Sequence, residues 1–199
     1  MIQSVENKII NYLKYRPKGK IYFLDDFSLL ANSESVRKSL SVLVKKGILI
    51  RLTQGIYLYP KIDKEFGVLY PSIDDVCHEI ARRDKARIEP TGIFALHRLG
   101  LSTQVPMNVV YLTDGIPRKI NYRNRIIKFK KTAPKNLSMK GEISSLVVFA
   151  LKEIGKSSVT DVMKLQLSQV LMRENLSNIR HDALLAPKWI SQLMQSLNN

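Results

Sequence analysis

The chain has 199 residues, 45% of them hydrophobic, and its 32 Lys and Arg against 17 Asp and Glu give a net charge of +15. The length fits one domain or two small ones, and the apolar fraction excludes a mostly disordered basic tail. A positive excess of this size indicates a polyanionic partner, either nucleic acid or an anionic membrane surface. The single cysteine excludes a disulfide framework and a multi-cysteine zinc site.

The start of the chain lacks an apolar signal-peptide region, and its densest apolar run, residues 146–151, is too short to cross a bilayer. We therefore expect a soluble protein of a reducing cytoplasm with no membrane partner. The charge is concentrated in two segments, with +6 in residues 1–60 and +9 in residues 116–140, where no acidic residue occurs. A function has to account for both segments.

The first 60 residues predict a succession of short elements. Apolar spacing predicts a helix over 3–15, which Pro17 and Gly19 end. A short strand over 20–23 and a short helix over 25–30 follow, and Asn32 or Ser33 is expected to cap a helix over 34–46. Gly47 is a stop signal for that helix. Residues 48–52 and 56–59 then predict a hairpin around Thr53-Gln54-Gly55.

This order of elements is that of a winged helix-turn-helix, in which the second helix of the pair enters the major groove of DNA and the hairpin forms the wing. Val36, Leu40, Leu43 and Val44 fall on one side of the helix over 34–46 and predict its core face. The polar side of that helix and the hairpin predict the DNA-binding residues: Glu34, Arg37, Lys38, Ser41, Lys45, Arg51, Thr53 and Gln54. A solvated basic face or a protein-docking module remains the alternative, because a fold does not prove a function.

The sequence divides into residues 1–60, a linker over 61–71 with Pro60, Gly67 and Pro71, and a second domain over 72–199. Within the second domain we expect a helix from Ser72, a short helix over 91–99 and a strand over 109–112. Helices are also expected near 146–154, 159–174 and 188–197. The predicted fold class is α+β, with an N-terminal winged helix-turn-helix followed by a mixed α/β domain with extra C-terminal helices.

Five runs in this order resemble the AbiE-type antitoxin family of type IV toxin–antitoxin and abortive-infection systems, over roughly residues 1–155. The runs are Gly55-Ile56-Tyr57-Leu58-Tyr59-Pro60, Ala81-Arg82-Arg83, Ala86-Arg87-Ile88-Glu89-Pro90-Thr91-Gly92, Leu99-Gly100-Leu101-Ser102-Thr103-Gln104-Val105-Pro106 and Tyr111-Leu112-Thr113-Asp114-Gly115. The resemblance implies a transcriptional autorepressor that binds operator double-stranded DNA and an antitoxin that counteracts a nucleotidyltransferase-like toxin, with or without a stable complex. The alternative is a stand-alone regulator or an interaction module without antitoxin activity.

Catalysis is not expected, because no known constellation of catalytic residues is present. None of His78, His97 and His181 has a partner at metal-ligand spacing, and no phosphate-binding, dinucleotide-binding or nucleophile-elbow motif occurs. We expect no cofactor, no metal and no small-molecule substrate. An enzymatic antitoxin that acts on a modified toxin or RNA is the remaining enzymatic alternative.

The second basic segment alternates with period two over 117–131 and predicts a hairpin that turns at Arg123-Asn124, since Asn tolerates a positive φ. Ile127 and Phe129 would share one face. The predicted second basic surface comprises Arg118, Lys119, Arg123, Arg125, Lys128 and Lys130. It is open to three interpretations: protection of a sheet edge by lysine, a second DNA-contacting surface that extends the contact beyond the winged helix, or contact with RNA or an acidic toxin surface. DNA or another nucleic acid is the preferred ligand.

Overall fold

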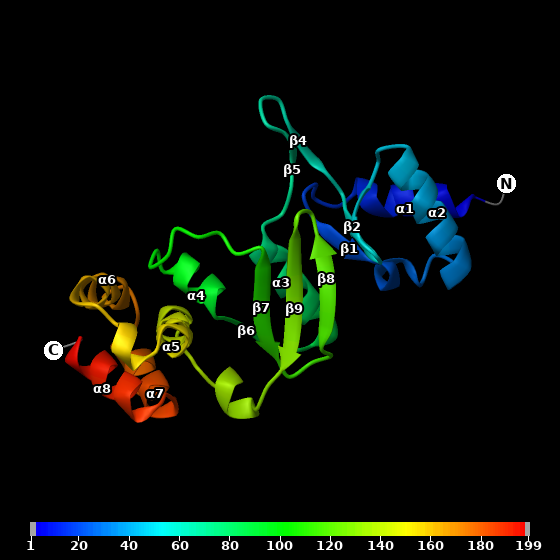
Figure 1. Cartoon of the computed structure of the whole chain (residues 1–199). Helices are drawn as coiled ribbons and strands as arrows, with labels where there is room; N and C mark the ends of the chain where they lie inside the picture. The colour runs from blue at the N-terminus through cyan, green and yellow to red at the C-terminus, as the bar shows by residue number, and fades with distance from the viewer. Residues whose placement is uncertain (1–2, 198–199) are drawn as a thin grey trace. The chain divides into compact units, whose positions relative to one another are not determined.

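The computed structural model describes residues 3–197, and the chain divides into two compact units between Glu79 and Ile80. This division lies inside helix α3 (Ile73–Asp84) and not in the segment 61–71, which the sequence analysis assigns to a linker. Both units contain helices and sheet, so the α+β class is confirmed (Figure 1). No helix within residues 3–197 is both long and apolar enough to span a membrane.

The first unit packs two helices on a small antiparallel sheet. Its sheet has the strand order β1-β3-β2, and Ile9, Leu13, Leu40 and Leu43 are fully buried in the core that the helices share with Tyr22. The elements are α1 (Val5–Lys14), β1 (Ile21–Phe23), the 3₁₀ helix η1 (Leu24–Phe27), α2 (Ser33–Lys45), β2 (Ile50–Thr53) and β3 (Ile56–Leu58). The predicted elements of residues 3–59 are therefore present in the predicted order.

The two ends of α2 are fixed by their own residues. The side chain of Asn32 accepts a hydrogen bond from the backbone N–H of Ser35 at 2.9 Å, which satisfies one of the free donors at the start of the helix. Gly47 has a φ of +71°, a left-handed conformation that lets Ile48 donate its N–H to the carbonyl of Leu43 at 3.0 Å. The chain therefore leaves α2 at a defined angle and turns directly into β2.

The segment 61–71 is not an irregular linker, because it contains the hairpin of β4 (Lys61–Asp63) and β5 (Gly67–Leu69). The carboxylate of Asp63 accepts the backbone N–H groups of Glu65 and Phe66 and closes the turn, where Gly67 has a φ of +69°. Such Asx turns replace the backbone hydrogen bonds of a tight turn. The mixture of Pro, Gly and charge that suggested a linker is thus the composition of a turn.

The second unit is built on a mixed sheet with the strand order β6-β7-β9-β8. Its strands are β6 (Ile88–Thr91), β7 (Asn108–Thr113), β8 (Arg118–Tyr122) and β9 (Arg125–Lys131). β9 runs parallel to β7 and antiparallel to β8, so it lies inside the sheet while β8 forms an edge. Strand β6, which falls partly in the range 91–99 predicted as a helix, was not predicted. The helix there is shorter and begins after Gly92.

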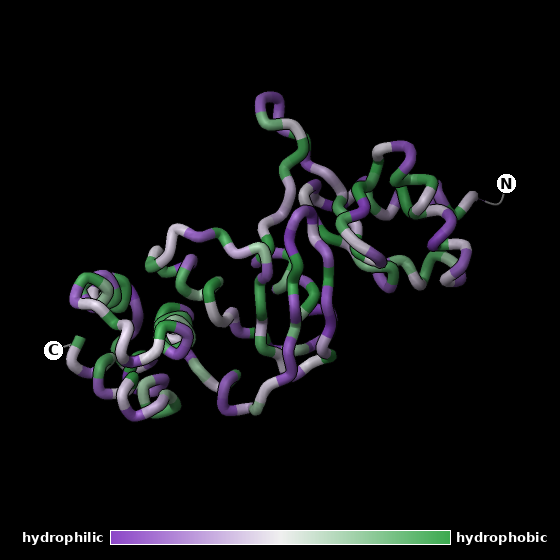
Figure 2. Tube along the Cα trace, in the orientation of Figure 1, coloured by the Kyte–Doolittle hydropathy of each residue, from purple (hydrophilic) through white to green (hydrophobic). Residues whose placement is uncertain are grey.

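Helix α5 is the centre of the helical part of this unit, and all its residues from Ser144 to Leu151 are buried. Figure 2 shows α5 as largely hydrophobic and β8 as largely hydrophilic. α7 was not predicted, whereas the other C-terminal helices were. The helices are α4 (Ile93–Arg98), η2 (Pro134–Leu137), α5 (Glu142–Ile154), η3 (Lys156–Ser158), α6 (Asp161–Leu171), α7 (Leu176–Leu185) and α8 (Lys188–Ser196).

Two carboxylates from other elements cap the start of α5. Asp182, which is fully buried on α7, accepts the backbone N–H groups of Lys140 at 2.8 Å and Gly141 at 2.9 Å, and the hydroxyl of Ser144. Glu174 accepts the N–H of Ile143 at 3.0 Å. These carboxylates satisfy donors that the helix itself cannot, and they place negative charge at the positive end of its dipole. They tie α5 to α7.

Candidate nucleic-acid interface

A cleft of about 590 Å³ lies within the first unit, between α2 and the hairpin of β2 and β3. We call it the α2 cleft. It is lined from η1, α2 and the hairpin by Leu24, Arg37, Ser41, Val44, Lys45, Arg51, Gln54, Gly55 and Tyr57. Arg37, Ser41 and Lys45 follow one another at intervals of four residues, so they form one row along the helix.

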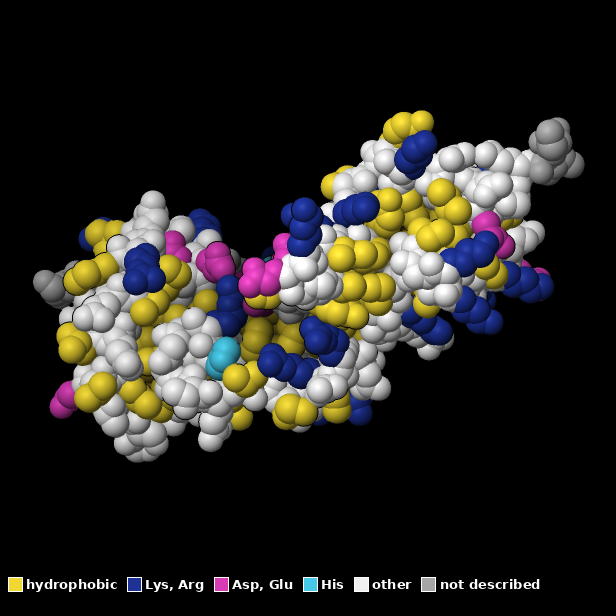
Figure 3. Space-filling model, turned by 90° about the horizontal axis from the view of Figure 1, so that it is seen from above, with side chains coloured by type: hydrophobic (Ala, Val, Ile, Leu, Met, Phe, Trp, Pro, Cys, Tyr) yellow, Lys and Arg dark blue, Asp and Glu magenta, His cyan; other side chains and the backbone are white. Residues whose placement is uncertain are grey.

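The α2 cleft is positively charged, since Arg37, Lys45 and Arg51 line it and no carboxylate of residues 3–197 does. All three cations are exposed. None of them forms an ion pair or a side-chain hydrogen bond with a residue that the structure describes. More generally, Lys and Arg outnumber Asp and Glu on the face seen in Figure 3. Unpaired cations on adjacent walls of a cleft are suited to an anionic ligand that extends along it.

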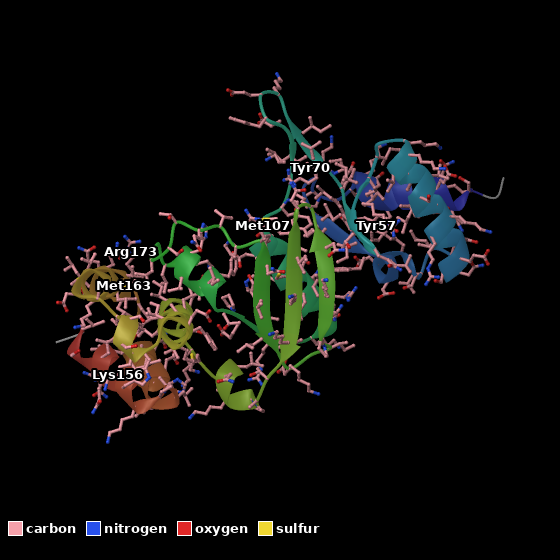
Figure 4. The ribbon with its side chains drawn as sticks, in the orientation of Figure 1. Tyr57, Tyr70, Met107, Lys156, Met163 and Arg173 are labelled. Atoms are coloured by element: carbon pink, nitrogen blue, oxygen red, sulfur yellow. The ribbon has the colours of Figure 1, made fainter. Side chains whose placement is uncertain are left out.

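Apolar and neutral polar groups complete the α2 cleft. Tyr57, labelled in Figure 4, is 7% exposed, and Leu24 and Val44 are half-buried. Ser41 and Gln54 are exposed on opposite walls and offer both donors and acceptors. The cleft thus combines positive charge, hydrogen-bonding groups and a buried aromatic side chain.

Five of the eight predicted DNA-binding residues come together in the α2 cleft: Arg37, Ser41, Lys45, Arg51 and Gln54. The other three do not line it. Lys38 and Glu34 form an ion pair with each other at 2.7 Å across one turn of α2, and both side chains are mostly exposed. Thr53 is half-buried, where an irregularity between Arg51 and Thr53 interrupts the pairing of β2 with β3.

Sequence reasoning missed Leu24, Val44, Gly55 and Tyr57 as lining residues of this cleft. Val44 was assigned to the core face of α2, and it does pack against the core, but it is only partly buried and also reaches the cleft. Gly55 and Tyr57 were noted only as parts of the hairpin. The glycine at position 55 signalled a tight turn in the sequence, and it has a φ of +74° in the structure, but nothing in the sequence placed that turn beside α2.

The second basic segment forms the predicted hairpin, with Tyr122 opposite Arg125 at the turn. At that turn the left-handed residue is Arg123, with a φ of +51°, and not Asn124 as expected. Ile127 and Phe129 are buried on one face as predicted. The predicted cations separate into two groups, because the pleat of the sheet directs alternate side chains to opposite faces.

Arg118 lies on the same face of this sheet as Phe129, which is directly opposite it. Its guanidinium forms an ion pair with Asp84 of α3 and lies 6.0 Å from the ring centroid of Phe129. Burial and the neighbouring charge of Arg83 lower the pKa of Arg118 from its usual value. Arg125 is half-buried and shares this face, as its register opposite Tyr122 requires. Arg118 is thus a structural residue rather than part of a basic surface.

Lys119, Lys128 and Lys130 lie on the opposite face. Lys119 is directly opposite Lys128 in the antiparallel ladder, and Lys130 follows two residues later on the same face. We call these three residues the lysine face.

Comparison with known proteins gives a family for the chain. A family model described as "Family of unknown function (DUF6088)" matches residues 8–179. A solved structure to which the chain is similar is the crystal structure of the RV2827C protein from Mycobacterium tuberculosis, with 11% identity and a TM-score of 0.40. The alignment covers 98% of this chain and 82% of that one. No curated protein sequence matches this chain. Since the family model spans most of the sequence, the chain belongs to the DUF6088 family, whose function is unknown.

Proposed function

We propose that the protein is a DNA-binding transcriptional regulator whose first unit is a winged helix-turn-helix, with α2 as the recognition helix and β2–β3 as the wing. The observation that carries the proposal is the α2 cleft, in which Arg37, Lys45 and Arg51 converge from helix and hairpin with no acidic partner among the described residues. The element order supports it, since α1, η1, α2 and the β2–β3 hairpin follow one another as in that motif.

In the proposed complex, the exposed row of α2 enters the major groove and the hairpin contacts the adjacent backbone. The sugar–phosphate chain then runs along the α2 cleft, where Arg37, Lys45 and Arg51 neutralise phosphates. Ser41 and Gln54 supply hydrogen bonds to base edges, which distinguish base pairs in the major groove. The contacts with phosphates provide affinity, and the contacts with base edges provide sequence preference.

The resemblance of the sequence to AbiE-type antitoxins leads us to propose a specific role for this regulator. It would bind an operator at its own promoter, repress its operon, act in the cytoplasm and counteract a nucleotidyltransferase-like toxin. This is a binding function and requires no catalytic step by the chain. The antitoxin role is tested by expressing the chain together with a nucleotidyltransferase-like neighbour of its gene. Growth rescued by the chain supports the role, and growth arrest that persists refutes it.

The DNA-binding proposal is tested with the full chain and overlapping duplexes from the region upstream of its gene. Fluorescence anisotropy gives the affinity of the wild type, of R37Q/K45Q/R51Q and of K14Q/K18Q/K61Q. The last variant removes the same charge from exposed residues of the first unit outside the cleft. We expect the cleft variant to lose at least 100-fold in affinity and the control only a few-fold, since a single charged contact contributes about 1 kcal/mol or more.

Two outcomes would contradict this proposal. If the cleft variant binds every duplex as the wild type does, α2 is not the recognition helix. If the wild type binds no duplex at physiological salt and instead retains an acidic protein partner, the first unit is a protein-docking module.

A further inference from the structure

The lysine face concentrates charge beyond what the fold requires. Residues directly opposite in an antiparallel pair have Cβ atoms about 4.5–5.5 Å apart, and residues two apart in a strand are separated by about 7 Å. Lys119, Lys128 and Lys130 therefore hold three ammonium groups on a small area of β8 and β9. None of the three forms an ion pair or side-chain hydrogen bond with a described residue, whereas Arg118 on the other face is paired with Asp84.

Protection of a sheet edge does not account for this arrangement. Lysines on edge strands prevent two sheets from joining, and this explains Lys119 on the edge strand β8. Lys128 and Lys130, however, are on β9, which is hydrogen-bonded to β7 on one side and to β8 on the other. An interior strand has no free edge to protect. Like charges directly opposite each other are unfavourable, so the lysine face opposes folding unless an anion neutralises it.

The chemistry of the lysine face indicates the kind of polyanion. Lysine ammonium groups contact phosphates as point charges and do not read bases bidentately as arginine does. Single-stranded nucleic acid is held mainly by stacking on exposed aromatic rings. The aromatic side chains of this sheet, Tyr111, Tyr122 and Phe129, are at most 4% exposed and offer no stacking surface. The lysine face is thus suited to the outer backbone of a duplex.

We propose that the lysine face is a second, sequence-independent binding surface for the phosphate backbone of duplex DNA. The inference rests on the proposed function for the choice of DNA as the polyanion, and it adds a contact from the second unit. Three phosphates neutralised by three lysines would steepen the salt dependence of binding without changing the preference for one sequence over another.

The test uses the full chain, one upstream duplex that the wild type binds and one random duplex of the same length. Affinities are measured over a salt series for the wild type and for K119Q/K128Q/K130Q. The control K156Q/R180Q/K188Q removes the same charge from exposed positions elsewhere in the second unit. We expect the lysine-face variant to reduce the log–log salt slope by about 2–3 for both duplexes and to leave their affinity ratio unchanged. The control should retain the wild-type slope.

A folding control accompanies the binding data. Because the substitutions remove like-charge repulsion, the melting temperature of the lysine-face variant should equal or exceed that of the wild type, so weaker binding cannot be assigned to unfolding. An unchanged salt slope on both duplexes overturns the proposal. So does a lowered affinity ratio, because it would mean that the face reads sequence. The cleft variant R37Q/K45Q/R51Q distinguishes the two proposals. If it binds like the wild type while the lysine-face variant loses slope, the proposed function fails and the lysine face stands.

Discussion

Asp182 shows how a single buried carboxylate can hold together the helices of the second unit. Burial by itself raises the pKa of Asp182, but hydrogen bonds from His181, from Ser144 and from the backbone of Lys140 and Gly141 outweigh burial and lower that pKa. The folded state therefore prefers the ionised form more strongly than the unfolded chain does. This contributes stability above the unfolded pKa of about 4, which is lost as the pH falls through the lower folded pKa.

Replacement of Asp182 by Asn should lower the free energy of unfolding at pH 7 by about 3 kcal/mol, because the backbone donors at the start of α5 lose a charged acceptor. Urea denaturation at pH 7 and at pH 3 checks this, and the difference between wild type and D182N should shrink at pH 3. D161N is the matched control, since Asp161 is exposed and bonds only to Lys164 in the described part of the chain. An equal loss in both variants would contradict the capping role.

Gly141 lies between the carboxylates of Asp182 and Glu174 at the start of α5. A Cβ at this position would collide with Ser144 Oγ and with the carboxylate of Glu174. The φ of Gly141 is −92°, so space and not backbone conformation excludes a side chain here. We expect G141A to lose about 1–3 kcal/mol of unfolding free energy, as overpacked sites do. The combined variant G141A/E174A should still be less stable than the wild type. Its loss of unfolding free energy should, however, be smaller than the sum of the losses of G141A and E174A. Simple additivity in denaturation experiments would show that the two side chains do not interfere.

Lys38 and Arg37 are adjacent on α2, yet they should differ in their effect on DNA binding. Arg37 lines the α2 cleft and has no partner in the described residues, while Lys38 is paired with Glu34 outside it. In anisotropy measurements R37Q should weaken binding about 10-fold or more and reduce the salt slope by about 1, whereas K38Q should change the affinity less than 3-fold. Equal losses would mean that the phosphates run along the outer surface of α2 and not through the cleft.

At the scale of the element, the β8–β9 hairpin places like charges opposite each other, and one substitution can reverse this. K119E would face Lys128 directly and form a cross-strand ion pair. We expect a gain of about 0.5–1 kcal/mol in unfolding free energy, reduced at high salt, together with weaker DNA binding. K156E is the control, because it makes the same change of charge at an exposed lysine outside the hairpin. A gain as large for K156E would assign the effect to net charge rather than to the pair.

Some elements could be predicted from the sequence because local signals were sufficient. The caps Asn32 and Gly47 determine α2, and period-two alternation determines the β8–β9 hairpin. Strand β6 could not be found in this way, because it includes Pro90 and a carboxylate. Such a strand is tolerated only at an edge, and its place there depends on pairing with β7. The row of cations on α2 was likewise visible in the sequence, whereas the α2 cleft was not, since η1 and the hairpin supply its remaining walls.

For the whole molecule, the two proposed surfaces should act on the same measured quantity. Three cations of the α2 cleft and three of the lysine face neutralise about six phosphates, which gives a log–log salt slope of roughly −5 for the wild type. The sextuple variant that combines both sets of substitutions should retain almost no salt-dependent binding. A wild-type slope near −3 would mean that only one surface contacts the DNA.

The repulsion between Lys119 and Lys128 also has a consequence for the protein when no DNA is present. A ligand that binds only the folded state stabilises it by RT ln(1 + [L]/Kd), about 2.7 kcal/mol at a hundred times Kd. DNA bound to the lysine face would stabilise the folded state in this way, and it would also remove the repulsion between the two lysines. Molecules released from DNA would then unfold more often and be degraded sooner than bound ones. The lifetime of the protein in the cell, and so its abundance, would follow the number of DNA sites available to it.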